Sequence, residues 1–131
     1  MSEEFKIEIV NPEKSFLSKE NVKEVVLPAF EGEMGILKDH ISIISFLKPG
    51  IIKVYSKSEE NKYFVEDGIV EYFDNSLVVL SVSAINLKDL SKEFLDNLSK
   101  DTQDKLVQKD ISDHERYMLN HKLDALKEIR V

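Results

Sequence analysis

The chain has 131 residues, 42% of them hydrophobic, which is enough for one compact core with or without an appendage but too few for two ordinary domains. The absence of cysteine excludes disulfide frameworks, cysteine-based zinc sites and thiol catalysis. A formal net charge of −7 argues against nucleic acid as a partner, because such binding depends on Lys and Arg neutralising phosphates. No apolar run reaches the roughly 18 residues that span a bilayer, and no signal or transit peptide pattern is visible, so we expect a cytoplasmic chain without direct membrane insertion.

The first part of the chain has the pattern of short β-strands. Phe5, Ile7 and Ile9 alternate with polar residues, which predicts a strand with one buried face. Further β-rich runs lie at residues 22–27, 42–47, 51–55, 63–66, 69–73 and 77–82. Turn-forming residues separate the runs, at 11–12, 28, 32–35, 49–50, 58–61, 67–68 and 74–76. Closely spaced strands without an intervening helical stretch indicate a β-sandwich or a small barrel.

The composition changes near residue 86. All four Gly and all three Pro precede this point. Residues 1–86 carry 15 acidic and 9 basic side chains, whereas residues 87–131 carry 10 and 9. Because Gly and Pro are unfavourable inside helices, the change predicts a turn-rich domain at 1–86 and a helical domain at 87–131.

Two amphipathic helices are predicted in the second part. The apolar stripe of the first consists of Leu87, Leu90, Phe94, Leu95, Leu98 and Leu106. Ser112 followed by Glu115 fits a capping box, so a second helix should begin near Ser112. Its apolar stripe consists of Met118, Leu119, Leu123, Ala125, Leu126 and Ile129. The short polar join near residues 109–110 favours an antiparallel hairpin whose stripes face each other or the β-rich part.

A location of these helices on a membrane surface is the less favoured alternative. Membrane-surface helices are usually rich in Lys and Arg on their polar face. The polar face of the second helix mixes His121, Asp124 and Glu128 with Lys127. Packing within the chain or against a protein partner explains the two stripes better.

No constellation of residues predicts catalysis, a metal site or a nucleotide site. His114 and His121 would lie roughly 10 Å apart along a helix, which favours two solvated side chains over a shared metal ion. Glu31 and Glu33 could form an acid/base pair, but in a Gly-rich turn they should both be exposed and ionised. The spacing of Gly32 and Gly35 fits neither common phosphate-binding glycine motif.

One segment carries a resemblance to a known family. Residues 22–54 read VKEVVLPAFEGEMGILKDHISIISFLKPGIIKV. This segment resembles the epsilon subunit of F-type ATP synthases, which is called delta in mitochondria. The similar features are a strand ending at Pro, an acidic loop that ends in His, and a Leu-x-Pro-Gly sequence before the next strand. Weaker similarity extends over residues 5–85.

The resemblance implies an α+β fold, with an N-terminal antiparallel β-sandwich of ten strands followed by a C-terminal two-helix antiparallel hairpin. It also implies a non-catalytic rotor subunit of the central stalk, without a cofactor. Such a subunit couples proton-driven rotation of the c-subunit ring to ATP synthesis through the gamma subunit. Its location would be the cytoplasmic face of the bacterial inner membrane, as a peripheral part of the complex.

The resemblance also assigns a contact with the c-ring to the loop. The residues concerned are Glu31, Gly32, Glu33, Met34, Gly35, Lys38, Asp39 and His40. We expect Gly32 and Gly35 to hold the turn, because glycine reaches backbone angles that are closed to other residues. For His40, a local hydrogen bond that shapes the loop is as good an interpretation as a contact with another subunit. Lys38-Asp39 replaces the Pro-Gly that is common before the loop histidine in the family.

The regulatory functions of the family form the alternative interpretation. The first C-terminal helix often opens with an Ile/Leu-Asp-x-x-Arg-Ala motif that contributes to ATP binding. Here residues 90–95 read LSKEFL, and Phe94 cannot supply a charge for phosphate, so no nucleotide site is predicted. The second helix can inhibit ATP hydrolysis by contacting the catalytic beta subunit, a third candidate partner. Arg116, Lys127 and Arg130 are the candidates for that contact, although a solvated charged flank is the simpler interpretation.

Overall fold

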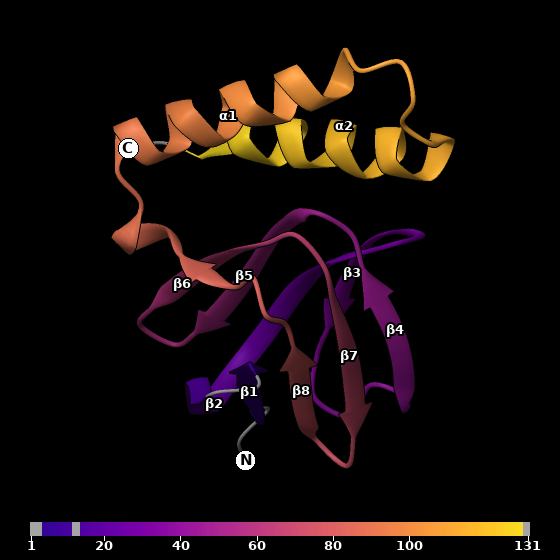
Figure 1. Ribbon diagram of the computed structural model, residues 1–131. Helices are drawn as coiled ribbons and strands as arrows, with labels where there is room; N and C mark the ends of the chain where they lie inside the picture. Colours follow the sequence, from indigo (N-terminus) through magenta and orange to yellow (C-terminus); the bar gives the residue numbers. More distant parts are fainter. Residues whose placement is uncertain (1–3, 12–13, 130–131) are drawn as a thin grey trace.

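The computed structural model describes residues 4–11 and 14–129. Nine strands precede a short 3-10 turn and two α-helices in this part of the chain (Figure 1). The strands are β1 (Phe5–Asn11), β2 (Lys14–Ala29), β3 (Gly32–Ile36), β4 (Ile43–Leu47), β5 (Gly50–Ser56), β6 (Glu60–Val65), β7 (Gly68–Phe73), β8 (Ser76–Leu80) and β9 (Ile85–Asn86). The helical segments are η1 (Leu87–Asp89), α1 (Lys92–Leu106) and α2 (Asp113–Glu128). The predicted α+β fold is confirmed.

The sheet curls back on itself, so that the strand at one end pairs with a strand in its middle. Its strand order is β1-β8-β7-β4-β2-β5-β6-β9, and β1 also pairs with β2. This is possible because β2 is long and bends near Asn21, which has a φ of 61°. The first half of β2 pairs with β1, and the second half pairs with β3 and β5. Counting the two halves as separate strands gives the ten strands that the resemblance implied.

The expectation of a wholly antiparallel sandwich needs one correction. β1 and β8 run parallel, with Ile7 opposite Leu77 and Ile9 opposite Val79. The remaining strand pairs are antiparallel. A parallel neighbour is available to β1 because the chain passes through β2 to β7 before β8 returns beside it.

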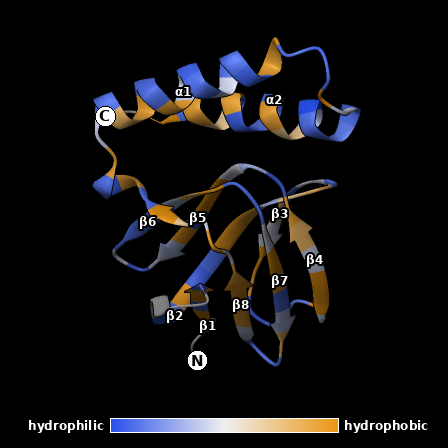
Figure 2. Ribbon diagram, viewed as in Figure 1, coloured by the Kyte–Doolittle hydropathy of each residue, from blue (hydrophilic) through white to orange (hydrophobic). Residues whose placement is uncertain are grey.

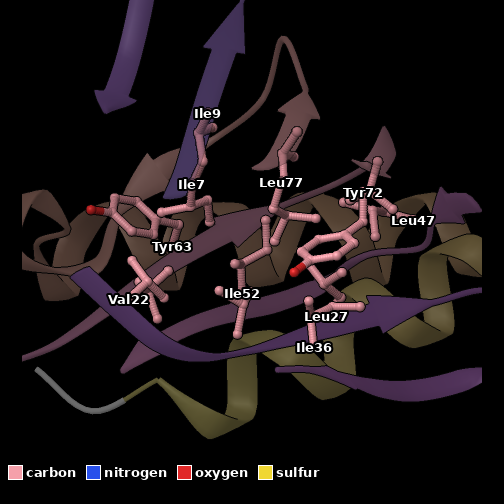
Figure 3. Close-up of a cluster of buried hydrophobic side chains, with 14 of the residues drawn as sticks. Ile7, Ile9, Val22, Leu27, Ile36, Leu47, Ile52, Tyr63, Tyr72 and Leu77 are labelled. Atoms are coloured by element: carbon pink, nitrogen blue, oxygen red, sulfur yellow. The ribbon is translucent and has the colours of Figure 1, made fainter. Parts of the chain in front are cut away.

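The main hydrophobic core lies inside this curled sheet. Every strand from β1 to β8 supplies a residue to it. Figure 3 shows Tyr72, Leu77 and Ile52 pointing toward one another from different strands. Tyr72 is almost fully buried and meets Phe5 edge to face, with ring centroids 5.7 Å apart. Burying each large aliphatic side chain contributes on the order of 1.5–3 kcal/mol, so these residues fix the sandwich as a firm unit.

The prediction of a turn over residues 32–35 is wrong for most of that segment. Ala29 pairs with Gly32, so the turn consists of Phe30 and Glu31, and residues 32–36 form β3. Gly32 has a φ of 132°, a conformation that other residues rarely adopt. Gly35 lies within the strand, outside the left-handed region, so it does not hold the turn as expected.

The helix starts follow their capping residues. Ser91 accepts a hydrogen bond from the Phe94 amide at 3.1 Å, so α1 begins at Lys92 and not at Leu87 as the apolar stripe suggested. The predicted helix start at Ser112 is confirmed, because the Glu115 amide donates to the Ser112 hydroxyl at 3.1 Å. The Glu115 carboxylate accepts from the Ser112 hydroxyl at 3.4 Å, whereas the capping box predicted a bond with a backbone N–H. Phe94 departs from the predicted stripe, since 44% of its surface is exposed.

The two helices form the predicted hairpin and lie together on one side of the sandwich (Figure 1). Their apolar sides face each other and the sheet, and their blue, hydrophilic sides face outward (Figure 2). A second buried cluster joins hairpin and sandwich, and its members are Ile51, Phe64, Leu90, Leu95, Ala125, Leu126 and Ile129. An ion pair between Lys122 and Glu66 crosses the same junction. No helix in the described residues is both long and apolar enough to span a bilayer.

Candidate functional site

The outward surface of β4, β7 and β8 is mainly apolar, and Glu71 of β7, opposite Ile44, is the charged residue within it. Ile44 is 71% exposed, Phe46 59% and Phe73 65%. We define the outer apolar face by these three residues together with Ile69, Leu80 and Val82. Large apolar side chains gathered on the outside of a sheet mark a surface that another molecule covers.

The strand register makes this face continuous. Phe46 lies opposite Ile69, and Ile69 lies opposite Leu80. Their sequence neighbours Leu47, Val70 and Val79 are buried in the core. Because side chains alternate across a strand, these strands are apolar on both surfaces. Figure 2 shows the hydrophobic colour along β4, β7 and β8.

A hollow extends the outer apolar face toward the helices. It has a volume of about 720 Å³, and Phe46, Ile69 and Leu80 form its sheet side. Phe30, His114 and Met118 complete it from the β2–β3 turn and from α2. A partner covering the face can therefore also contact the first turns of α2.

Sequence reasoning missed this face, although a signal for it was present. Adjacent apolar residues occur in β4 as Ile43-Ile44 and in β7 as Ile69-Val70, and such pairs cannot both point into one core. Because side chains alternate along a strand, one residue of each pair must point outward.

The eight residues predicted to contact a ring do not form one surface. Glu31, Gly32 and Glu33 lie at the β2–β3 turn, beside α2. Lys38, Asp39 and His40 follow the other end of β3, near the β7–β8 turn. A five-residue strand, roughly 16 Å long, separates the two groups. Met34 and Gly35 lie between them, and Met34 packs partly against the main core.

The residues at the β2–β3 turn are exposed, as expected for Glu31 and Glu33. The turn itself is held from outside by α2. The Phe30 ring stacks on Tyr117 at 6.2 Å between centroids, and the Tyr117 hydroxyl donates to the Phe30 carbonyl at 3.3 Å. The backbone of the turn is therefore fixed while its carboxylates stay accessible.

The loop at residues 38–40 is held by bonds within the sandwich. Asp39 has a φ of 66°, so it adopts the left-handed conformation, which is uncommon for residues other than glycine. Asn75 accepts from the Asp39 amide at 2.8 Å and donates to the Asp39 carboxylate at 3.1 Å. The buried Tyr72 hydroxyl also donates to Asn75, and burial raises the pKa of Tyr72. His40 Nδ1 lies 2.7 Å from the Ile41 carbonyl oxygen, which agrees with a local hydrogen bond that shapes the loop.

The candidate inhibitory residues differ in their surroundings. Arg116 is exposed and donates to the Leu106 carbonyl at 3.2 Å, which ties the start of α2 to the end of α1. Lys127 is exposed near the end of α2. Arg130 lies outside the described residues.

The histidine pair needs a correction. His114 is exposed, as predicted, but His121 is half-buried between α2 and the sandwich. His121 packs edge to face on Tyr117, with centroids 4.3 Å apart. Burial and the nearby Lys48 lower the pKa of His121, and Asp124 opposes this change. In the described part of the chain, no group of three or more His, Asp or Glu residues is arranged to hold a metal ion.

Comparisons with known sequences agree on one family. The sequence model for the ATP synthase delta/epsilon chain β-sandwich domain matches residues 4–87. The ATP synthase epsilon chain of Pelagibacter ubique (strain HTCC1062) is 63% identical over 127 residues, covering 97% of this chain and 98% of the relative. That of Parvibaculum lavamentivorans (strain DS-1 / DSM 13023 / NCIMB 13966) is 35% identical over 135 residues, covering 99% and 98%.

Solved structures share the fold. A chain in the Euglena gracilis mitochondrial ATP synthase matches with a TM-score of 0.74 at 19% identity, covering 97% of this chain and 79% of the other. A chain from the Tetrahymena thermophila mitochondrial ATP synthase central stalk and c-ring matches with a TM-score of 0.66 at 14% identity, covering 94% and 93%. With the sequence matches, these findings show that the chain belongs to the delta/epsilon chain family of ATP synthase.

Proposed function

We propose that this chain is a non-catalytic rotor subunit of the ATP synthase central stalk, coupling rotation of the c-ring to ATP synthesis through the gamma subunit. The outer apolar face carries the proposal, because it needs a permanent protein partner. Membership of the family and the fold shared with chains of central-stalk assemblies support the same function.

The gamma subunit is the proposed partner of the outer apolar face. Ile69 of β7 lies in its middle, opposite Phe46 on one side and Leu80 on the other. Phe46 is the aromatic residue of this row, and large aromatic residues in a covered patch often contribute much of the binding energy. A curled sheet with a packed core suits this task, since a subunit that transmits torque must resist deformation.

The contact with the c-ring is proposed at the β2–β3 turn, through Glu31 and Glu33. Both carboxylates are exposed on a backbone that α2 holds in place. Lys38, Asp39 and His40 are assigned a structural role instead, because Asp39 and His40 take part in the local bonds of their loop. The proposed location is the cytoplasmic face of a bacterial inner membrane, since the two epsilon chains compared above come from bacteria.

A binding measurement with purified gamma subunit tests the proposal. The Phe46→Asp and Leu80→Asp variants should each weaken the complex at least tenfold, because a charge replaces an apolar contact. Phe94→Asp is the matched control, since Phe94 is an exposed aromatic residue on α1, away from the face. Equal binding by all three variants and the unaltered chain would reject the outer apolar face as the gamma site.

The ring contact has a separate test. The double variant Glu31→Gln with Glu33→Gln should weaken binding to purified c-ring. The effect should be clearest at low ionic strength, because salt screens the interaction between exposed charges. Glu20→Gln with Glu60→Gln removes the same charge from exposed positions on other strands and should have no effect. Retained ring binding by the first pair would remove the β2–β3 turn from the proposal.

A further inference from the structure

The first half of α2, next to the α1–α2 connection and called here its distal half, is held to the sandwich by aromatic side chains. No residue from Asp113 to Asp124 is buried, whereas Ala125, Leu126 and Ile129 are buried. Over that first half, Phe30 stacks on Tyr117 with an interplanar angle of 6° and on His114 at 20°. The Tyr117 hydroxyl adds one hydrogen bond to the Phe30 carbonyl. Docking of this half therefore depends on a few ring contacts, this hydrogen bond and the ion pair between Lys122 and Glu66.

His121 completes this arrangement one helical turn further along. Its ring meets the Tyr117 ring at 4.3 Å between centroids and an interplanar angle of 64°. We call Phe30, Tyr117 and His121 the aromatic latch. His121 also lines a hollow of about 250 Å³ between α2 and the sandwich, so docking removes part of its contact with water.

The charges that face this hollow come from every element around it. Lys48, in the segment between β4 and β5, and Lys53 of β5 supply positive charge. Glu33 of β3 and Asp124 and Glu128 of α2 supply negative charge. Burial of the His121 ring and, after it, the charge of Lys48 oppose protonation of His121, and together they outweigh Asp124, which favours it. The imidazolium form of His121 is therefore unfavourable while α2 is docked, although carboxylates outnumber lysines around the hollow.

We propose that the aromatic latch is proton-sensitive, and that protonation of His121 releases the distal half of α2 from the sandwich. The neutral imidazole packs on Tyr117 in the hollow. The imidazolium instead faces Lys48 with reduced access to water, and both interactions favour the released helix, where the ring is solvated.

The direction of the pH dependence follows from linkage. The pKa of His121 is lower in the docked state than its ordinary value of 6.5. Docking is therefore fully favourable above the ordinary pKa and weakens as the pH falls through 6.5 toward the docked pKa. For each pH unit by which docking lowers the pKa of His121, the equilibrium constant for docking falls about tenfold at pH values below the docked pKa. The response thus falls in the range where cellular pH varies.

Energy transfer between two dyes measures docking in the full chain. The chain contains no cysteine, so cysteines placed at Asp110 and Ser58 label specifically. Both positions are exposed, one in the α1–α2 connection and the other between β5 and β6. Transfer should change reversibly between about pH 7.5 and 5.5, a range that brackets the ordinary His pKa. A constant signal over this range in the unaltered chain overturns the proposal.

Matched variants identify the group that titrates. His121→Phe keeps an uncharged ring beside Tyr117 and should remain docked across the range. His114→Gln removes the other histidine of α2 and should retain the full pH response. Lys48→Gln should reduce the response, because it removes the charge that opposes protonation. A response that persists in His121→Phe, or disappears in His114→Gln, overturns the assignment to His121.

A nuclear magnetic resonance titration provides a check that needs no engineered dye. The His121 ring should titrate at lower pH in the unaltered chain than in Leu126→Asp, which places a charge in the buried hairpin contact and releases α2. Equal midpoints, or a higher midpoint in the unaltered chain, contradict the latch.

Discussion

Asn75 holds the loop that follows β3 through bonds with two parts of the chain. It bonds the Asp39 amide and carboxylate and accepts from the Tyr72 hydroxyl. Its own φ is 58°, and that of the neighbouring Asp74 is 49°. These two left-handed residues form the tight turn between Phe73 and Ser76. The Asp39 conformation therefore depends on a residue 36 positions away.

Replacing Asn75 tests this dependence. Asn75→Ala should lower the free energy of unfolding by roughly 2–4 kcal/mol, because three hydrogen bonds and a favourable left-handed residue are lost together. Asp74→Ala shares only the backbone effect and should cost about 1 kcal/mol. Urea denaturation measures both values, and equal losses would mean that the Asn75 side-chain bonds contribute nothing.

Gly50 and Gly35 both lie in strands but should differ in how well they tolerate a side chain. A Cβ added at Gly50 would lie 2.4 Å from the Pro28 Cβ, whereas one added at Gly35 would first meet Glu24 Oε2, at 3.4 Å. Gly50→Ala should cost at least about 2 kcal/mol through overpacking. Gly35→Ala should change stability by less than about 0.5 kcal/mol. Thermal unfolding of both variants checks this, and a large loss for Gly35→Ala would restore the predicted role of Gly35 in the turn.

Among the elements, a local signal predicted the start of α2, whereas the apolar stripe placed the start of α1 too early, at Leu87 and not at Lys92. The Ser112 and Glu115 pattern gave the start of α2, because a cap is satisfied within one turn. β3 was missed because Gly32 and Gly35 disfavour strands, and it forms only through pairing with β2. The first half of β2 was missed because its sequence is mostly polar, and its pairing with β1 decides its structure. Nonlocal pairing could not be read from local propensity.

The candidate site shows the same limit. The Glu31–Glu33 segment was found through the family resemblance, but its separation from residues 38–40 depends on the length of β3. The outer apolar face was visible only as pairs of adjacent apolar residues. Which residue of each pair points outward is settled by the register of β4, β7 and β8.

The hairpin and the sandwich should respond differently to core substitutions. We propose that residues 1–86 and 87–131 are separate domains, because the main core contains no residue beyond Ala84 among the described residues. Leu77→Ala should destabilise the whole chain by roughly 2–5 kcal/mol. Leu126→Ala should instead increase amide hydrogen exchange in α1 and α2 and leave the strands protected. Equal loss of protection in the strands of both variants would mean that the chain unfolds as one unit.

Three features of the whole molecule suit a subunit that joins two partners. They are the closed sandwich, the outer apolar face and the exposed β2–β3 turn. The sandwich supplies a firm body, and the turn borders the face, because Phe30 of the turn lines the hollow beside Phe46. The helices add a docked unit whose distal half is the least buried part of the hairpin. We therefore propose that the sandwich provides the coupling contacts and that the helices are the part available for regulation.

ATP-driven proton pumping by the cognate ATP synthase in vesicles tests the coupling function most directly. The enzyme is prepared without this subunit, and the chain is then added back. The unaltered chain should restore pumping per ATP hydrolysed, whereas Phe46→Asp should not, because it cannot join the stalk. Efficient pumping without the chain, or equal restoration by Phe46→Asp, would contradict a coupling role exerted through the outer apolar face.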